Sequence, residues 1–300
     1  MVDMLRSRAA TNPLDIAYIY LVDGERREES LTYGELDLRA RTIGAALQAN
    51  HAVDQPVLLL FPHGLDYICG FVGCLNAGAI AVPSYPPRFN RTLSRLQAII
   101  TDSEARVILT MSAIRDKARL FFEQAPALRE IKWIAVDELD EELAAQWSMP
   151  EIDGDSLAFL QYTSGSTSAP RGVMVSHGNL IENQRCIQRA FDQKEESVIV
   201  SWLPLYHDMG LIGGVLQPLY LGARCILLSP ASFLQKPIRW LQAISRYGAT
   251  TSGGPDFAYD LCVRRTTPEQ REALNLSTWS VAFNGAEPIR ERTLTSRAGV

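Results

Sequence analysis

A strand–helix–strand pattern in the first third of the sequence constrains the fold more than any other feature. Residues 57–61 form an unbroken apolar run, residues 66–77 form a segment rich in small residues, and residues 79–82 form a second apolar run. A strand that is apolar along its whole length is buried on both faces, as in a parallel sheet. Two such strands connected through a helix form a parallel unit. The pattern therefore predicts an α/β fold with a mostly parallel sheet.

The alternation of apolar runs and helical segments continues along the chain and predicts two successive α/β series. A polar stretch, residues 151–156, separates them, so we expect a first α/β subdomain over residues 1–155 and a second over residues 156–300. Further strands are expected at 16–22, 31–33, 106–109, 133–136, 157–160, 173–175, 198–202, 225–228 and 281–284. Further helices are expected at 4–12, 33–47, 93–103, 114–124, 178–191, 211–220, 237–247 and 256–264.

The segment 161–173, with the sequence QYTSGSTSAPRGV, is rich in hydroxyl side chains and glycine and lies between two of the expected strands. Glycines let backbone N–H groups approach a ligand closely, and hydroxyls with free amides form a concave anion site. Arg171 can bind phosphate oxygens through a planar set of donors. The Walker pattern is absent, and composition alone leaves an ordinary loop rich in serine, threonine and glycine as the alternative. We interpret the segment as a loop that binds a nucleotide triphosphate.

Charge and cysteine usage exclude several classes of function. A net charge of −5 argues against a nucleic-acid-binding surface. The five cysteines include no Cys-x-x-Cys pair, which favours buried thiols over a zinc site or a disulfide framework. The N-terminus lacks the apolar core of a signal peptide, and the most apolar stretch, residues 67–82, is too short to span a bilayer comfortably. We therefore expect a cytoplasmic protein without a transmembrane segment.

Residues 203–210, with the sequence LPLYHDMG, follow an expected strand and precede an expected helix. In open α/β sheets, ligands collect at the carboxyl ends of strands, which makes His207 a candidate site residue. The alternative is a simple helix start, in which Asp208 interacts with the amides of the first turn.

Residues 251–259, with the sequence TSGGPDFAY, join a strand to a helix. Gly253 and Gly254 remove side-chain bulk where a ligand must pass. The alternative is a tight turn followed by Asp256 as the cap of the next helix.

Residues 283–288, with the sequence FNGAEP, again end an expected strand. Gly285 and Ala286 are small enough for a flat base to lie on the backbone, and Asn284 can donate to and accept from an adenine edge. A glycine turn before a helix is the alternative interpretation.

The order of residues in these segments resembles the adenylate-forming superfamily, which includes acyl-CoA synthetases and adenylation domains. Tyr-Thr-Ser-Gly-Ser-Thr at 162–167, followed by Pro-Arg-Gly at 170–172, is similar to the phosphate loop of that superfamily, although Ser168 replaces the usual glycine and Arg171 the commoner lysine. The arginine form, Tyr-Pro-Pro-Arg at 85–88 and Asn-Gly-Ala-Glu-Pro at 284–288 most resemble fatty acyl-AMP ligases. The resemblance implies two stacked, mostly parallel sheets flanked by helices.

The resemblance also implies a role for each motif, with ATP and Mg²⁺ as cofactors. His207 and Arg171 would take the catalytic roles, with His207 beside the acyl carboxylate, and no residue of this chain is assigned as a metal ligand. Residues that would bind the β- and γ-phosphates are Thr163, Ser164, Gly165, Ser166, Thr167 and Arg171. The adenine segment would be Asn284, Gly285, Ala286 and Glu287, and the acyl pocket would be formed by His207, Gly253, Gly254 and Phe257.

The implied reaction is ATP-dependent activation of a fatty acid to an acyl-adenylate with release of pyrophosphate. The acyl group would then pass to the phosphopantetheine thiol of an acyl carrier protein or domain, in lipopeptide, polyketide or lipid biosynthesis. A long-chain acyl-CoA ligase is one alternative, and a catalytically incomplete fragment that binds nucleotide or carrier protein is another. After Glu287 the sequence contains no Tyr-Gly-x-x-Glu magnesium motif of the superfamily and no late catalytic lysine. We therefore expect a truncated N-terminal domain that is inactive in isolation.

Overall fold

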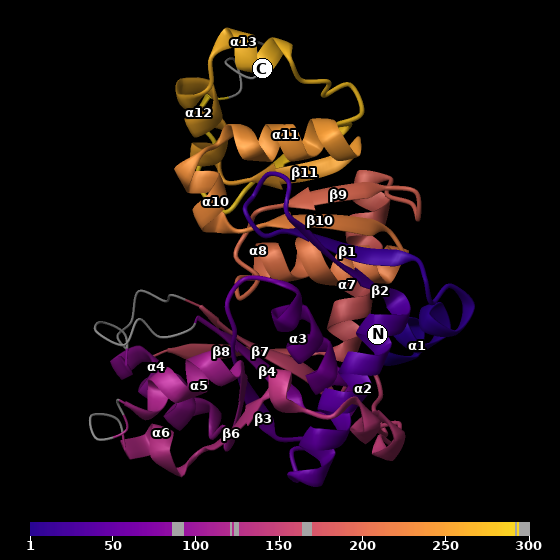
Figure 1. Ribbon diagram of the computed structural model, residues 1–300, viewed down its shortest axis with the longest axis vertical. Coiled ribbons are helices and arrows are strands. Elements are labelled where there is room, and N and C mark those ends of the chain that lie inside the picture. Colours follow the sequence, from indigo (N-terminus) through magenta and orange to yellow (C-terminus); the bar gives the residue numbers. More distant parts are fainter. Residues whose placement is uncertain (86–92, 121, 123–125, 164–169, 292, 294–300) are drawn as a thin grey trace. The chain divides into compact units, whose positions relative to one another are not determined.

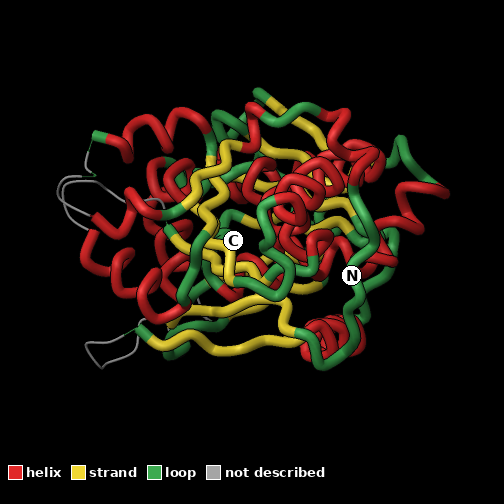
Figure 2. Tube along the Cα trace, turned by 90° about the horizontal axis from the view of Figure 1, so that it is seen from below, coloured by secondary structure: helices red, strands yellow, loops and turns green. Residues whose placement is uncertain are grey.

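The computed structural model describes residues 1–85, 93–120, 122, 126–163, 170–291 and 293 (Figure 1). The chain divides into two compact units, the first formed by residues 1–15 and 33–183 and the second by residues 16–32 and 184–300. Among the described residues, each unit contains one six-stranded sheet. Strands of both sheets, yellow in Figure 2, run between helices, as the alternating sequence pattern predicts.

The sheet of the first unit has the strand order β6-β5-β3-β4-β7-β8. Its pairs are parallel except for β7 and β8, which form an antiparallel hairpin. The strands are β3 (Pro56–Leu60), β4 (Ile80–Ser84), β5 (Val107–Thr110), β6 (Lys132–Ala135), β7 (Leu157–Thr163) and β8 (Arg171–Ser176). The helices are α1 (Val2–Thr11), α2 (Tyr33–Ala49), α3 (Leu65–Ala77), α4 (Leu93–Ser103), α5 (Ser112–Arg119) and α6 (Pro126–Glu130), with two 3₁₀ turns at Val136–Glu138 and Glu141–Gln146.

The sheet of the second unit has the strand order β12-β11-β9-β10-β1-β2. Only β2 is antiparallel to its neighbour. The strands are β1 (Ile16–Leu21), β2 (Glu28–Thr32), β9 (Val198–Ser201), β10 (Arg224–Leu228), β11 (Thr251–Gly254) and β12 (Val281–Asn284). The helices are α7 (His177–Phe191), whose first residues belong to the first unit, α8 (Asp208–Leu211), a π-helical turn (Ile212–Leu216), α9 (Gln217–Leu221), α10 (Pro230–Gln235), α11 (Ile238–Tyr247), α12 (Asp256–Arg265) and α13 (Pro268–Glu272).

The predicted strand–helix–strand unit is confirmed. Strands β3 and β4 pair in parallel, and α3 between them is buried along almost its whole length. Helix α4 packs on the same sheet through Leu96, Ile99 and Ile100, which join a cluster with side chains from β3, β4 and β5. The helix expected at 114–124 ends earlier, at Arg119.

The division into units differs from the expected boundary between residues 155 and 156. The polar stretch before β7 does not separate the sheets, because β7 pairs with β4 and completes the first sheet together with β8. Conversely, β1 and β2 come from the first part of the chain but join the second sheet, where β1 pairs in parallel with β10.

An aromatic cluster forms the core of the second unit on the side of the sheet that α11 covers in Figure 1. The ring of Trp202 stacks on Phe233 with centroids 4.0 Å apart, and Trp240 meets both rings edge-on. The buried indole N–H of Trp240 donates to Ser252 Oγ at 2.8 Å, which satisfies a polar group that would otherwise be costly to bury. This cluster supports the ends of β9 and β11, where candidate site residues follow.

Candidate active site

The two ends of the predicted phosphate loop lie on the β7–β8 hairpin in the first unit. Thr163 and Arg171 are register partners at the end of the hairpin where the connecting residues begin, and both side chains are exposed. Ser164, Gly165, Ser166 and Thr167, the central residues of the prediction, lie outside the described residues.

Tyr162 anchors the same end of this hairpin. Its hydroxyl donates to Asp102 Oδ2 of α4 at 2.6 Å, and its ring lies against Gly172, where an added Cβ would be only 3.0 Å from the ring. Burial and the hydrogen bond to Asp102 raise the pKa of Tyr162, so the phenol remains a neutral donor at physiological pH. The Tyr162 ring therefore packs closely on Gly172, the residue directly after Arg171.

In the second unit, the ends of three neighbouring strands bring the other candidate residues together. Strands β9, β11 and β12 are adjacent and parallel, so the segments that follow them emerge at one edge of the sheet. Contacts confirm this convergence: an added Cβ at Gly285, after β12, would lie 3.6 Å from the terminal methyl of Met209, after β9. Ligand sites of open α/β sheets occupy this kind of position.

His207 follows β9 directly before α8. Its backbone N–H donates to the Pro204 carbonyl at 3.1 Å, and a Cβ at Gly210 would lie 2.2 Å from the same oxygen, so the turn requires glycine there. Asp208 accepts from the Met209 N–H at 2.7 Å, which is the helix start proposed as the alternative. The imidazole itself is 59% exposed, with Nδ1 3.8 Å from Asp208 Oδ1. The helix start and a ligand role for His207 are compatible, because the side chain that forms the start is Asp208.

Gly253 and Gly254 belong to β11 itself and are buried. A Cβ at Gly253 would lie 2.3 Å from the Phe283 carbonyl oxygen, and one at Gly254 would lie 2.8 Å from the Trp202 ring. Close packing of β12 and of the aromatic cluster thus accounts for both glycines, and their expected role in an acyl pocket stays a prediction. Phe257, in the first turn of α12, is 38% exposed and meets the Trp202 ring edge-on at 6.1 Å.

The predicted adenine segment ends β12. Asn284 Nδ2 donates to Asp256 Oδ1 at 3.1 Å, and Ala286 has a φ of 67°, a left-handed conformation that is costly for a residue with a Cβ. The Glu287 carboxylate accepts from the Phe257 backbone N–H at 2.7 Å. The segment is therefore tied to the first turn of α12 at two points.

Asp256 is the residue that sequence reasoning missed, since it was considered only as a helix cap. Pro255 holds the cap position, while the Asp256 carboxylate, 1% exposed, accepts from Asn284 Nδ2 and from Thr293 Oγ1 at 3.0 Å. Burial would raise the pKa of Asp256, but these hydrogen bonds and that of the Arg290 N–H together lower it below its ordinary value. No local pattern reveals this role, because the donors come from 28 to 37 residues further along the chain.

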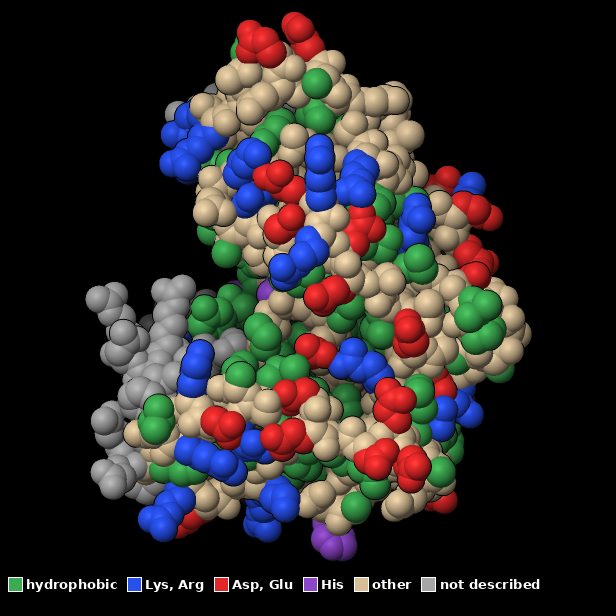
Figure 3. All heavy atoms as spheres, viewed as in Figure 1, with side chains coloured by type: hydrophobic (Ala, Val, Ile, Leu, Met, Phe, Trp, Pro, Cys, Tyr) green, Lys and Arg blue, Asp and Glu red, His purple; other side chains and the backbone are tan. Residues whose placement is uncertain are grey.

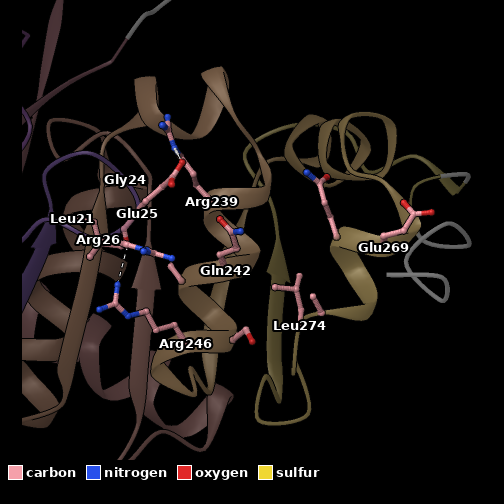
Figure 4. Close-up of a pocket in the computed structure, with 13 residues that line it drawn as sticks. Leu21, Gly24, Glu25, Arg26, Arg239, Gln242, Arg246, Glu269 and Leu274 are labelled. Atoms are coloured by element: carbon pink, nitrogen blue, oxygen red, sulfur yellow. Dashed lines mark hydrogen bonds and ion pairs between the residues drawn. The ribbon is translucent and has the colours of Figure 1, made fainter.

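A cavity of about 760 Å³ lies elsewhere in the second unit and contains none of the predicted site residues (Figure 4). It is bounded by the β1–β2 turn, α11 and α13. On its wall, Glu25 accepts from Arg239 at 3.0 Å and from Lys236 at 2.9 Å. The basic side chains there serve to hold the turn against α11.

The surface charge, the cysteines and the metal-binding side chains can be compared with the expectations from the sequence. On the face shown in Figure 3, basic and acidic side chains are interspersed. Four cysteines are buried as expected, but Cys186 is exposed on α7, which corrects the expectation for that thiol.

Within the described ranges, no three His, Cys, Asp or Glu side chains gather into a group that could hold a metal ion. A search of the same residues finds no helix with the length and apolar character needed to cross a bilayer.

Two parallel-rich sheets flanked by helices, with candidate site residues at the ends of neighbouring strands, define the N-terminal domain of an adenylate-forming enzyme. A family model described as AMP-binding enzyme matches residues 5–298, and the chain belongs to this family. The superfamily resemblance deduced from the motifs is thereby confirmed.

Individual proteins similar to this chain are fatty-acid ligases by name. The chain is 46% identical over 298 residues to the medium-chain-fatty-acid–[acyl-carrier-protein] ligase JamA of Moorena producens, with 98% of this chain and 50% of that protein covered. It is 36% identical over 307 residues to the putative fatty-acid–CoA ligase FadD21 of Mycobacterium tuberculosis, covering 98% and 52%. The crystal structure of a fatty acyl-adenylate ligase from Legionella pneumophila, in complex with acyl adenylate and pyrophosphate, matches with a TM-score of 0.91 and 45% identity over 98% of this chain and 51% of that one. The chain spans about half the length of the curated relatives it matches.

Proposed function

We propose that the whole protein is a fatty acyl-AMP ligase that activates a fatty acid with ATP and transfers the acyl group to a carrier-protein thiol. The observation that carries this proposal is the convergence of the His207, Phe257 and Asn284 segments at one edge of the second sheet. The match to a Legionella ligase solved with acyl adenylate and pyrophosphate supports the reaction class.

The chemistry requires in-line attack of a carboxylate on the α-phosphate and departure of pyrophosphate. A fatty acid carboxylate is already ionised near neutral pH, so it needs no general base. In the proposal, the residues bind, orient and neutralise charge. The exposed Arg171 guanidinium and the loop from Thr163 bind the β- and γ-phosphates, and the segment from Asn284 to Glu287 binds adenine.

His207 is proposed as a polar neighbour of the acyl carboxylate, and Phe257 as part of the apolar wall of the acyl pocket. Both side chains are partly exposed and follow adjacent strands. Magnesium, when bound, would neutralise negative charge on the phosphates. The described residues present no group of three ligands for it, so no residue of this chain is assigned to the metal.

The first experiment measures fatty-acid-dependent release of pyrophosphate and formation of acyl-AMP by the whole protein. Acyl-AMP should appear only when ATP and a fatty acid are both present. Replacement of the imidazole in His207→Ala should raise the KM for the fatty acid more than the KM for ATP. An absence of acyl-AMP with fatty acids of all chain lengths tested would contradict the proposal.

A long-chain acyl-CoA ligase is the competing function, and the mycobacterial relative FadD21 is named a putative fatty-acid–CoA ligase. Incubation of the acyl-AMP complex with either holo-carrier protein or free coenzyme A separates the two. Transfer to the carrier thiol supports the proposal, whereas efficient thioester formation with coenzyme A favours the alternative. The 300-residue chain alone is expected to release little pyrophosphate, since it spans about half of its relatives; pyrophosphate release by this chain that matches the whole protein would contradict this.

A further inference from the structure

Asn284 carries a buried amide oxygen that has no hydrogen-bond partner among the residues that the structure describes. The other end of the same amide is satisfied, because Nδ2 donates to Asp256 Oδ1 at 3.1 Å. A buried acceptor without a partner is costly, so the great majority of buried polar groups in folded proteins have a hydrogen-bond partner. The acceptor is therefore a candidate contact for a ligand that offers an N–H.

The position of Asn284 in β12 supports this interpretation. Successive side chains of a strand point to opposite faces of the sheet. Phe283 stacks on Phe191 of α7 with centroids 5.8 Å apart, while Asn284 meets Asp256 at the start of α12. The register partner of Asn284 on β11 is Gly254, and the Trp202 ring takes the space that a side chain at Gly254 would fill.

The Asp256 carboxylate determines which end of the Asn284 amide it contacts and which end is left for another donor. A carboxylate accepts hydrogen bonds and does not donate them, so only Nδ2 can face it. Its other oxygen accepts from Thr293 Oγ1 at 3.0 Å, and the Arg290 N–H lies 3.4 Å from Oδ1. These bonds hold the carboxylate in place and keep it ionised. A turned amide would place its oxygen against the negative charge.

We propose that Asp256 is a positioning residue that presents Asn284 Oδ1 as an acceptor and thereby selects a 6-aminopurine over a 6-oxopurine nucleotide. The inference rests on the proposed function, in which the segment from Asn284 to Glu287 binds the base of ATP. The 6-amino group of adenine donates to Oδ1, whereas the 6-oxo group of hypoxanthine or guanine is an acceptor and repels it. Asp256 does not touch the base and acts through Asn284.

The test compares ATP with ITP in the whole protein, because ITP differs from ATP at the purine 6-position without the 2-amino group of GTP. Wild-type protein should prefer ATP in kcat/KM for acyl-AMP formation. Asp256→Asn provides a neutral partner that can donate or accept, so the Asn284 amide can turn. The ATP-to-ITP ratio should fall at least tenfold in this variant, and equilibrium binding of the two nucleotides should show the same change.

Thr293→Val is the matched control, because it removes a hydrogen bond to Asp256 Oδ2 and leaves the bond of Oδ1 to Asn284. It should lower the melting temperature while the ATP-to-ITP ratio stays within about twofold of wild type. An equal loss with both nucleotides in Asp256→Asn would overturn the proposal. A ratio that falls as far in Thr293→Val would also overturn it. Asp256→Ser, which also removes the acceptor-only partner, replaces Asp256→Asn if that variant does not fold.

Asn284→Ala separates this inference from the proposed function. If it leaves the KM for ATP unchanged, Asn284 does not contact adenine. The assignment of the adenine segment and the inference about Asp256 are then both wrong. If it raises the KM for ATP while Asp256→Asn leaves the ratio unchanged, only the inference about Asp256 is wrong.

Discussion

The Glu287 carboxylate accepts a hydrogen bond from the backbone N–H of Phe257 at 2.7 Å, and so joins the segment after β12 to the first turn of α12. An acidic group at this end of a helix is stabilising, because the first N–H groups have no partner within the helix. The sequence had suggested Glu287 as part of the adenine site, and the structure shows one of its oxygens engaged in positioning Phe257.

Glu287→Ala should lower the free energy of unfolding by about 1 kcal/mol, the typical loss for a helix N-terminal acceptor. Glu287→Gln keeps an acceptor for the Phe257 N–H and should lose less than half as much. Urea unfolding of both variants measures the difference. Equal losses would show that the charge of Glu287, and not its hydrogen bond, matters at this helix end.

Arg171→Ala in the whole protein should raise the KM for ATP between roughly tenfold and a hundredfold, because a charge-assisted hydrogen bond to phosphate contributes about 1.5–3 kcal/mol. Arg171→Lys keeps the charge without the planar pair of donors and should fall between alanine and wild type. Arg224→Ala, at an exposed position on β10, is the control and should leave the KM unchanged. An unaltered KM in Arg171→Ala would remove this residue from the phosphate site.

Gly253→Ala should destabilise the protein by about 1–3 kcal/mol, the usual cost of overpacking. The added methyl group would lie 2.3 Å from the carbonyl oxygen of Phe283, and the backbone of β12 cannot move away without breaking its pairing with β11. Gly213→Ala is the matched control, since nothing lies within 4 Å of the added atom. Thermal unfolding should show a lower melting temperature for the first variant only; similar values for both would refute the packing argument.

His177, at the start of α7, predicts a pH dependence of stability. Burial lowers the pKa of this imidazole from its ordinary 6.5 to about 4 in the folded protein. Between these two values the unfolded chain binds more protons, so the free energy of unfolding decreases as pH falls from 6.5 towards 4, by up to ~3 kcal/mol. Below pH 4 this contribution is constant.

The measurement is the urea unfolding midpoint at pH 7 and pH 4.5. His177→Gln should lose less stability over this interval than wild type, because it has no proton to take up. His51→Asn is the control: His51 is exposed with a φ of 55°, a conformation that asparagine tolerates, and its replacement should leave the pH dependence intact. A wild-type-like pH dependence in His177→Gln would assign the effect to other groups.

Local sequence patterns were sufficient to predict most elements of this fold. Apolar runs such as 57–61 and helix signals such as Ser176 are read within a few residues; the Ser176 hydroxyl indeed accepts from the Asn179 N–H at 3.2 Å at the start of α7. Strand β11 was harder, because its Gly-Gly pair reads as a turn. It is a strand because β12 and Trp202 leave no room for side chains there.

The candidate site was predictable as a set of strand ends, but its internal bonds were not. Asp256 reads as a helix cap in the sequence, and only the fold brings Asn284 and Thr293 to its carboxylate. The phosphate-loop residues 164–169 lie outside the described part of the chain, so their assignment stays a prediction.

Strand β1 pairs in its sheet with β10, a strand that is synthesised much later than β1. Residues 18–21 pair with residues 225–228, so about two hundred residues must leave the ribosome before the partner strand exists. Closing so long a loop carries an entropic penalty and makes folding slow, because distant contacts cannot form early. Until then β1 can pair only with β2, which follows it directly, and the edge that β10 later covers keeps its backbone groups unpaired.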